Sequence, residues 1–148
     1  MPIYLDWLEQ PKEQDLVDLD KLFDDAPDDW LTDEGQHVNA HWALQQIASN
    51  KKLALGRFND RVVSAVWLVK QSEDASQPYQ YEIDKLCVRK ITRQRGVAKQ
   101  LMVRLCQWAN QQGCDLYIAD ADNRLAGLYE LGFVQHAQGW RYSARVTV

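Results

Sequence analysis

An apolar segment, a basic loop and an amphipathic segment follow one another between Leu86 and Lys99. Residues 86–88 end a strand-like run, the loop closes at Gly96, and apolar residues then recur at helical spacing: Val97, Leu101, Met102, Leu105 and Trp108. The first N–H groups of a helix have no intrahelical partner, and the helix dipole adds roughly half a positive charge there. The stretch therefore predicts a strand, a loop and a helix whose N-terminus holds an anion such as phosphate.

The loop carries the groups that such an anion needs. Gly96 lacks a Cβ, which lets a ligand approach the backbone, and Thr92 offers a hydroxyl donor. Seven basic residues fall within twenty positions around it: Lys85, Arg89, Lys90, Arg93, Arg95, Lys99 and Arg104. Spacing alone leaves a second interpretation open, in which Gly96 only starts the helix and the basic residues form a solvated face.

Length and composition indicate one globular domain over residues 1–148. With 46% hydrophobic and 26% charged residues, the chain has the composition of an ordinary soluble protein. No apolar run approaches the roughly 20 residues that cross a bilayer, and the first residues lack the basic and apolar regions of a secretory signal. We therefore expect a cytoplasmic protein without a membrane-spanning segment.

Cysteine and histidine spacing predicts no metal site. Cys87, Cys106 and Cys114 are odd in number and show no metal-binding spacing, which predicts reduced thiols. Cys106 falls on the inner face of the predicted helix, whereas Cys87, beside the basic loop, is either a partly buried strand residue or a reactive thiol. His37 and His41 would share a helix face, as two zinc ligands do, but no HExxH glutamate or third ligand accompanies them.

Charge is distributed unevenly along the chain. Residues 1–34 contain 12 acidic and 2 basic residues, whereas residues 35–148 contain 15 basic and 9 acidic ones. The predicted phosphate site lies in the basic part, as a phosphorylated ligand requires. Nucleic acid is the competing polyanion, but the acidic first part would repel a duplex, and no zinc-finger, RNP or helix-turn-helix pattern is present. We therefore expect no nucleic-acid partner.

Periodicity and turn residues predict the order of the elements. Strands are predicted at residues 3–8, 53–58, 62–69, 79–88, 116–119, 133–136 and 140–148. Helices are predicted at residues 13–23, 38–49, 97–112 and 125–131. Asn59-Asp60 reads as a two-residue hairpin turn, and Gly113 as a C-terminal helix cap. The order is strand, helix, helix, three strands, helix, strand, helix and two strands.

Two motifs placed in this order resemble those of the GCN5-related N-acetyltransferases, the GNAT family. Arg93-x-x-Gly96-x-Ala98 resembles the Q/R-x-x-G-x-G/A loop that holds the pyrophosphate of acetyl-CoA in that family. Residues 123–133 resemble its N-x-x-A-x-x-x-Y-x-x-x-G-F segment. The resemblance covers essentially the whole chain. It implies an α/β (α+β) GNAT fold, with a mixed, mostly antiparallel twisted sheet of about seven strands flanked by about four helices.

The resemblance implies acetyl-CoA as the ligand and assigns roles along the chain. Leu86, Cys87 and Val88 would pair with the pantetheine arm, and Asn123 and Arg124 would flank the cofactor. The pyrophosphate would lie against Thr92, Arg93, Gln94, Arg95, Gly96, Val97, Ala98 and Lys99.

Acetyl transfer also needs a base for the acceptor ammonium and an acid for the leaving thiolate. In GNAT enzymes the base is often a carboxylate on the central strands, and the acid is often a tyrosine. Glu82 and Asp84 lie on the corresponding strand, where alternation puts them on one face with Leu86 and Val88. Tyr129 stands one residue closer to the following Gly-Phe pair than in the family, which turns a helical side chain by about 100°. Catalytic roles for these three residues stay open, beside an interpretation of the carboxylates as solvated.

Several segments resemble one branch of the superfamily, the PanM (also called PanZ) proteins: residues 15–23, 57–61, 86–97, 132–133 and 139–140. The resemblance implies an acetyl-CoA-dependent regulator that binds aspartate α-decarboxylase, promotes its self-cleavage and restrains the mature enzyme in pantothenate biosynthesis. Arg57 and Asn59 would then contact the partner, although a hairpin Asn is also a simple turn former. An active N-acetyltransferase for a small-molecule or protein amine is the alternative function.

Overall fold

The computed structural model describes residues 2–26, 30–32, 34–47, 50–71, 80–92, 95–119, 131–136 and 139–145. The strands are β1 (Tyr4–Trp7), β2 (Lys51–Phe58), β3 (Arg61–Lys70), β4 (Gln80–Val88), β5 (Asp115–Ile118), β6 (Val134–His136) and β7 (Gly139–Tyr142). The helices are α1 (Glu13–Asp24), α2 (Ala40–Gln46), α3 (Val97–Gln112) and the short 3-10 turn η1 (Lys90–Thr92). The predicted fold class is confirmed, with three α-helices in the described residues rather than about four. The helix predicted at 125–131 falls almost wholly outside them.

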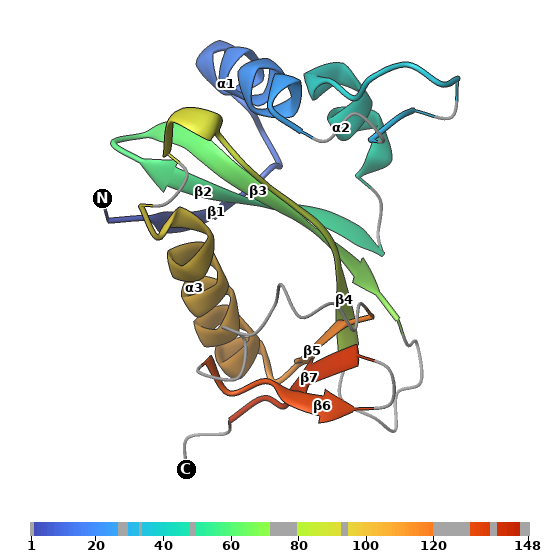
Figure 1. Ribbon diagram of the computed structural model, residues 1–148, viewed down its shortest axis with the longest axis vertical. Helices are drawn as coiled ribbons and strands as arrows, with labels where there is room; N and C mark the ends of the chain where they lie inside the picture. Colours follow the sequence, from blue (N-terminus) through green and yellow to red (C-terminus); the bar gives the residue numbers. More distant parts are fainter. Residues whose placement is uncertain are drawn as a thin grey trace.

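One seven-stranded sheet forms the centre of the molecule, in the order β1-β2-β3-β4-β5-β7-β6. Neighbouring strands are antiparallel except β4 and β5, which are parallel. In Figure 1, α1 and α2 cover one face of the β1–β4 region, and α3 covers the other. Each face has its own apolar core, with Leu101 and Leu105 of α3 on one side and Leu22 and Phe23 of α1 on the other. In the described part of the chain, no helix has the length and apolarity to cross a membrane.

The β2–β3 hairpin has the predicted two-residue turn. Asn59 (φ 49°) and Asp60 (φ 66°) both adopt the left-handed conformation that a type I′ turn requires. Both residues are exposed, so the hairpin presents Asn59 to solvent at its tip.

A bulge in β4 changes which side chains share a face. Leu86 pairs with Val66 and Ile83 with Leu68, so two residues of β4 lie opposite the single residue between Val66 and Leu68. Such an insertion reverses the alternation of side chains along the strand. Ile83 and Leu86 accordingly both pack on the α3 side, which puts Glu82 on the opposite face. The expectation that Glu82 shares a face with Leu86 is wrong.

Helix α2 is shorter than predicted. It covers Ala40–Gln46, and Asn39 caps it by accepting a hydrogen bond from the Trp42 N–H at 2.9 Å. His37 precedes the helix, in an isolated β-bridge. The expectation that His37 and His41 share a helix face is therefore wrong.

Candidate functional site

Helix α3 begins where the sequence predicts, beside open space. Gly96, which precedes it, adopts the left-handed conformation (φ 75°), and its carbonyl accepts a hydrogen bond from the Gln100 N–H at 3.0 Å. A Cβ at Gly96 would meet no heavy atom of the described structure within 4 Å. Glycine adopts this conformation without strain and leaves the N–H groups of the first turn, which contains Ala98, accessible to an anion.

Buried residues hold the first turn of α3 against the core. Val97 is 2% exposed and packs with Ile3, whose N–H donates to Gln100 Oε1 at 3.0 Å. Arg95 and Lys99 are exposed beside the same turn. Because the apolar residues hold the turn while Arg95 and Lys99 are exposed, the N-terminus of α3 is a fixed, positively charged surface that suits phosphate.

The turn before Gly96, η1, uses its own hydroxyl internally. Thr92 is 5% exposed, and its hydroxyl donates to the Arg89 carbonyl at 2.9 Å, while its N–H donates to the same carbonyl at 3.0 Å. In this geometry Thr92 braces the loop instead of offering its hydroxyl to a ligand. Arg93 and Gln94, the next residues of the predicted anion site, lie outside the described residues.

A carboxylate from the acidic N-terminal part holds the same loop. Asp25, the residue after α1, accepts hydrogen bonds from Arg89 Nε at 3.1 Å and from the Lys90 N–H at 3.0 Å. Burial raises the pKa of Asp25, but the hydrogen bonds from Lys90 and Arg89 outweigh it, so the pKa lies below its ordinary value. The carboxylate is therefore charged at neutral pH and balances one arginine of the loop.

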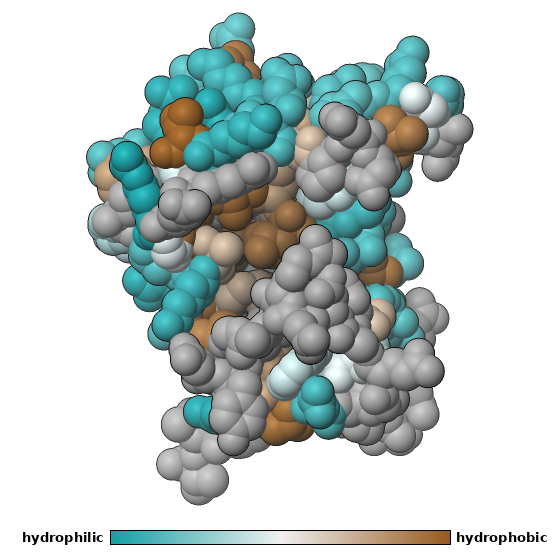
Figure 2. Space-filling view, in the orientation of Figure 1, coloured by the Kyte–Doolittle hydropathy of each residue, from teal (hydrophilic) through white to brown (hydrophobic). Residues whose placement is uncertain are grey.

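Strands β4 and β5 diverge in front of this loop. Their parallel pairing covers residues 80–82 and 115–117, after which β4 continues to Val88 while β5 ends at Ile118. Figure 2 shows apolar side chains in a depression near the middle of this face, in the region where Figure 1 draws β4 beside α3. An elongated ligand lying along β4 would reach the N-terminus of α3.

The main chain of β4 has polar groups that face the space where β4 and β5 diverge. The Arg89 N–H donates to the Val63 carbonyl at 2.9 Å. Cys87, two residues before Arg89, pairs with Ala65 and therefore also faces β3. Hydrogen-bonded and non-hydrogen-bonded pairs alternate along antiparallel strands, so the N–H and C=O of Leu86 point away from β3, toward the β5 side. An extended ligand with amide groups can pair at such an edge.

The side chain of Cys87 belongs to the core instead. It is 3% exposed, and its thiol donates to the Leu22 carbonyl at 3.3 Å. All three cysteines are buried and form no disulfide. Burial raises the pKa of Cys106 to about 12 and that of Cys114 to about 11. The placement confirms Cys106 as a core residue and favours Cys87 as a strand residue over a reactive thiol.

The candidate catalytic carboxylates belong to the first half of β4, whereas the proposed anion site follows the end of that strand. Glu82 accepts a hydrogen bond from Gln71 Nε2 near the start of β4, and Asp84 is exposed at the bulge. Tyr129, Asn123 and Arg124 lie outside the described residues. The described residues therefore assemble no acid–base pair, and the catalytic roles stay predictions.

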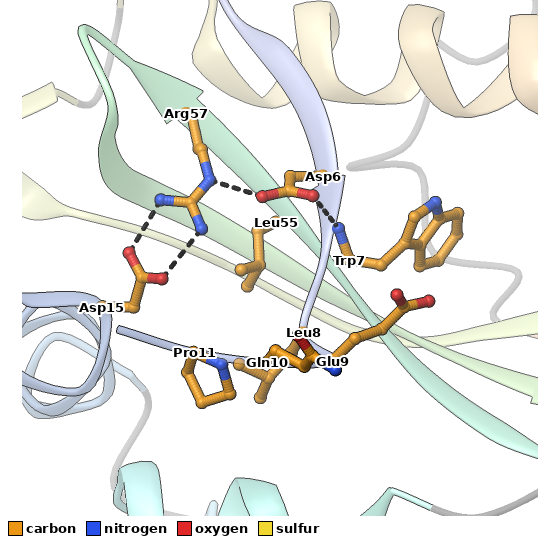
Figure 3. A pocket seen from close by; sticks show the side chains of 9 residues that line it. All are labelled: Asp6, Trp7, Leu8, Glu9, Gln10, Pro11, Asp15, Leu55 and Arg57. Atoms are coloured by element: carbon orange, nitrogen blue, oxygen red, sulfur yellow. Dashed lines mark hydrogen bonds and ion pairs between the residues drawn. The ribbon is translucent and has the colours of Figure 1, made fainter. Parts of the chain in front are cut away.

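The two candidate partner contacts differ in availability. Arg57 donates from Nε to Asp6 Oδ2 at 2.8 Å and from its two terminal nitrogens to Asp15 at 2.8 and 3.1 Å, and its side chain is 18% exposed. Figure 3 shows its guanidinium between the two carboxylates, beside a cavity of about 210 Å³. The hydrogen bonds from Arg57 lower the pKa of Asp15. Asn59, by contrast, is exposed at the hairpin tip.

Sequence reasoning missed the aspartates of α1. Asp15 and Asp18 are 6% and 1% exposed, so they are buried partners of arginines rather than a repulsive surface. Their spacing was a usable signal, because Asp15, Asp18, Leu22 and Asp25 recur along one face of a helix. Across the described residues, no group of three or more His, Cys, Asp or Glu side chains is placed to hold a metal ion.

The fold is that of the GNAT class of acetyltransferases. A solution NMR structure of the putative N-acetyltransferase YhhK from Escherichia coli, bound to coenzyme A, matches with a TM-score of 0.62 and 24% identity over 97% of this chain and 100% of that one. A GNAT family acetyltransferase from Staphylococcus aureus matches with a TM-score of 0.66 and 18% identity over 93% of this chain and 95% of that one. At these identities the likeness defines the fold.

The sequence narrows the class further. Residues 2–141 match the family described as "Acetyltransferase (GNAT) domain, PanZ". The chain therefore belongs to the PanZ family, which confirms the resemblance. It is also similar to the PanD regulatory factor of Escherichia coli (strain K12), with 26% identity over 141 residues that cover 90% of this chain and 92% of the relative.

Proposed function

We propose that this protein is a cytoplasmic, acetyl-CoA-binding regulator that binds aspartate α-decarboxylase, promotes its self-cleavage and restrains the mature enzyme in pantothenate biosynthesis. Membership of the PanZ family, the similarity to a PanD regulatory factor and the coenzyme A carried by a structural neighbour support the proposal. The observation that carries it is the N-terminus of α3, where Gly96 faces open space beside a basic loop.

The residues of this chain fit coenzyme A as follows. N–H groups of the first turn of α3 donate to the pyrophosphate, and Arg95 and Lys99 balance its charge. The exposed edge of β4 at Leu86 pairs with the amides of the pantetheine arm. When bound, the thioester supplies the acetyl group that distinguishes acetyl-CoA from CoA. Further proposed contacts are Arg93, Gln94, Asn123 and Arg124.

The hairpin is the proposed contact with the decarboxylase. Asn59 is exposed at its tip and touches the partner directly, whereas Arg57, clamped by Asp6 and Asp15, mainly holds the hairpin in place. Asn59→Asp keeps a residue that tolerates the left-handed conformation and changes only the amide group. We expect it to weaken binding of the decarboxylase while leaving acetyl-CoA affinity unchanged.

The test is a pull-down of aspartate α-decarboxylase proenzyme with and without acetyl-CoA, followed by measurement of its self-cleavage. The proposal expects a complex that needs acetyl-CoA and cleavage that is faster in its presence. A wild-type chain that saturates with acetyl-CoA but captures no decarboxylase, and leaves its cleavage rate unchanged, contradicts the regulatory role.

The alternative is a true N-acetyltransferase, which the exposed carboxylate of Asp84 at the β4 bulge supports as a general base. It predicts release of free thiol from acetyl-CoA above background with a panel of small-molecule and protein amines. Tyr129→Phe would then lower the rate if Tyr129 is the acid. Background release with every amine of a broad panel argues against this alternative.

A further inference from the structure

One face of α1 connects the loop before α3 with the β2–β3 hairpin. Asp15, Asp18, Leu22 and Asp25 are three, four and three residues apart, which aligns them along one side of the helix axis. Polar atoms on this face of α1 hold two parts of the sheet, the hairpin near the start of the helix and the end of β4 near its last turn. These two parts also meet directly, because the Arg89 N–H donates to the Val63 carbonyl at 2.9 Å. That backbone hydrogen bond does not involve the Asp25 side chain, so a variant at Asp25 distinguishes the route through α1 from the route through the sheet.

Near its first turn, α1 holds both strands of the hairpin. Arg57 of β2 donates to the two oxygens of Asp15 at 2.8 and 3.1 Å. Arg61 of β3 donates to Asp18 with a shortest distance of 2.7 Å, and the Val62 N–H donates to Asp18 at 3.0 Å. The two strands that carry the exposed turn are therefore fixed to one end of the helix.

Near its last turn, α1 holds the end of β4 and the start of η1. The Leu22 carbonyl accepts from the Cys87 thiol at 3.3 Å. Asp25 accepts from Arg89 Nε at 3.1 Å and from the Lys90 N–H at 3.0 Å. These residues lead directly into the proposed coenzyme A site.

The helix between the two attachment points is tightly packed. Leu19, Leu22 and Phe23 are 0% exposed and lie against the sheet. Close-packed protein interiors switch between discrete arrangements rather than deforming continuously, so a helix buried in this way tends to move as one unit. The helix spans about 18 Å at 1.5 Å per residue, so a shift at one end is carried to the other.

We propose that α1 couples ligand binding at the loop to the conformation of the hairpin. Asp25 is the positioning residue whose ion pair changes first when the ligand binds. This inference rests on the proposed function, because it takes the ligand to be an anion on this loop. Arg89 is paired with Asp25 and its side chain is 21% exposed. A bound pyrophosphate competes with Asp25 for this guanidinium. The ion pair therefore differs between the free and bound states, which is the difference in interaction free energy that coupling requires.

Two-dimensional ¹H–¹⁵N NMR of the full chain during a CoA titration tests the proposal. In the wild type, the amide peaks of Asn59 and Asp60, at the exposed tip of the hairpin, are expected to move as CoA saturates the protein. Asp25→Asn keeps an oxygen that accepts from the Lys90 N–H but removes the charge that holds Arg89. At saturating CoA this variant is expected to show less than half of the wild-type shift at Asn59.

A matched control lies next to it in the chain. Asp24 is exposed and makes no hydrogen bond or ion pair with another described residue, so Asp24→Asn makes the same charge change and is expected to keep the full shift. Asp18→Asn loosens the hairpin end, and it is expected to reduce the hairpin shift at unchanged CoA affinity. If Asp25→Asn does not fold, Arg89→Gln breaks the same ion pair from the loop.

Calorimetric titration of the same samples separates the two levels of the proposal. A wild type that binds CoA without movement of the Asn59 peak overturns the inference and leaves the proposed function standing. A folded Asp25→Asn variant with the full wild-type shift overturns it as well. A wild type that binds neither CoA nor acetyl-CoA overturns the proposed function, and this inference with it.

Discussion

The two polar regions of the molecule differ in what their charged groups face. Between α1 and the hairpin, Asp15 and Asp18 are buried against Arg57 and Arg61. At the start of α3, the main chain around Gly96 faces open space, with exposed basic residues beside it. The first region has its counterions within the chain and stabilises the fold. The second has a fixed backbone whose counterion is proposed to come from a ligand, so perturbations should separate stability from binding.

Acidification is expected to weaken the α1 region most, because it acts on all three aspartates at once. Asp15, Asp18 and Asp25 have a pKa below the ordinary 3.8 in the folded state. Their contribution is fully present above the unfolded pKa and is lost as the pH falls through the folded values. The free energy of unfolding, measured in urea, should be level near neutral pH and decline below about pH 4. A level profile down to pH 2 contradicts these ion pairs.

Asp18→Ala is the largest expected single-residue effect on stability. It leaves the Val62 N–H without its acceptor and removes the partner of Arg61. Because Arg61 is half exposed and regains water, we expect a loss of about 2 kcal/mol in the free energy of unfolding. Asp24→Ala, on the exposed side of the same helix, should change it by less than about 0.5 kcal/mol. Equal losses in the two variants would contradict the role of Asp18 as the buried partner of Arg61 and of the Val62 N–H.

Alanine at the two glycines that flank α3 sharpens the contrast between stability and binding. Gly96 (φ 75°) and Gly113 (φ 70°) are both left-handed, and a Cβ at either meets no heavy atom of the residues that the structure describes within 4 Å. Each substitution should cost about 1 kcal/mol of stability through backbone strain. Thermal unfolding should therefore shift similarly in both, while only Gly96→Ala weakens acetyl-CoA binding.

The ionisation of the buried cysteines should have the smallest effect on stability at neutral pH. Because burial raises the pKa of Cys106 to about 12 and of Cys114 to about 11, both thiols are protonated in the fold. Their contribution is present below the unfolded pKa, near 9.0, and is lost as the pH rises toward the folded values. At neutral pH a thiol reagent should label the native chain slowly and the urea-unfolded chain at once. Fast labelling of native protein contradicts the burial.

The sequence predicts local elements well and their mutual contacts poorly. The start of α3 after Gly96, its end at Gly113 and the Asn59-Asp60 turn follow from residue types that act within a few positions. The β4 bulge, which moves Glu82 to the other face, depends on pairing with β3 and leaves no local signal. Asp15 and Asp18 of α1 meet arginines more than forty positions away, which their charge alone did not indicate.

The central claim is that the N-terminus of α3 holds the pyrophosphate of acetyl-CoA, and calorimetric titration of the ligand tests it directly. Gly96→Glu places a carboxylate in this site and should lower the affinity at least about 100-fold. Gly113→Glu, which introduces the same residue at the same backbone conformation at the far end of the helix, should bind like the wild type. Retained affinity in Gly96→Glu, or an equal loss in both variants, would contradict the assignment of the site.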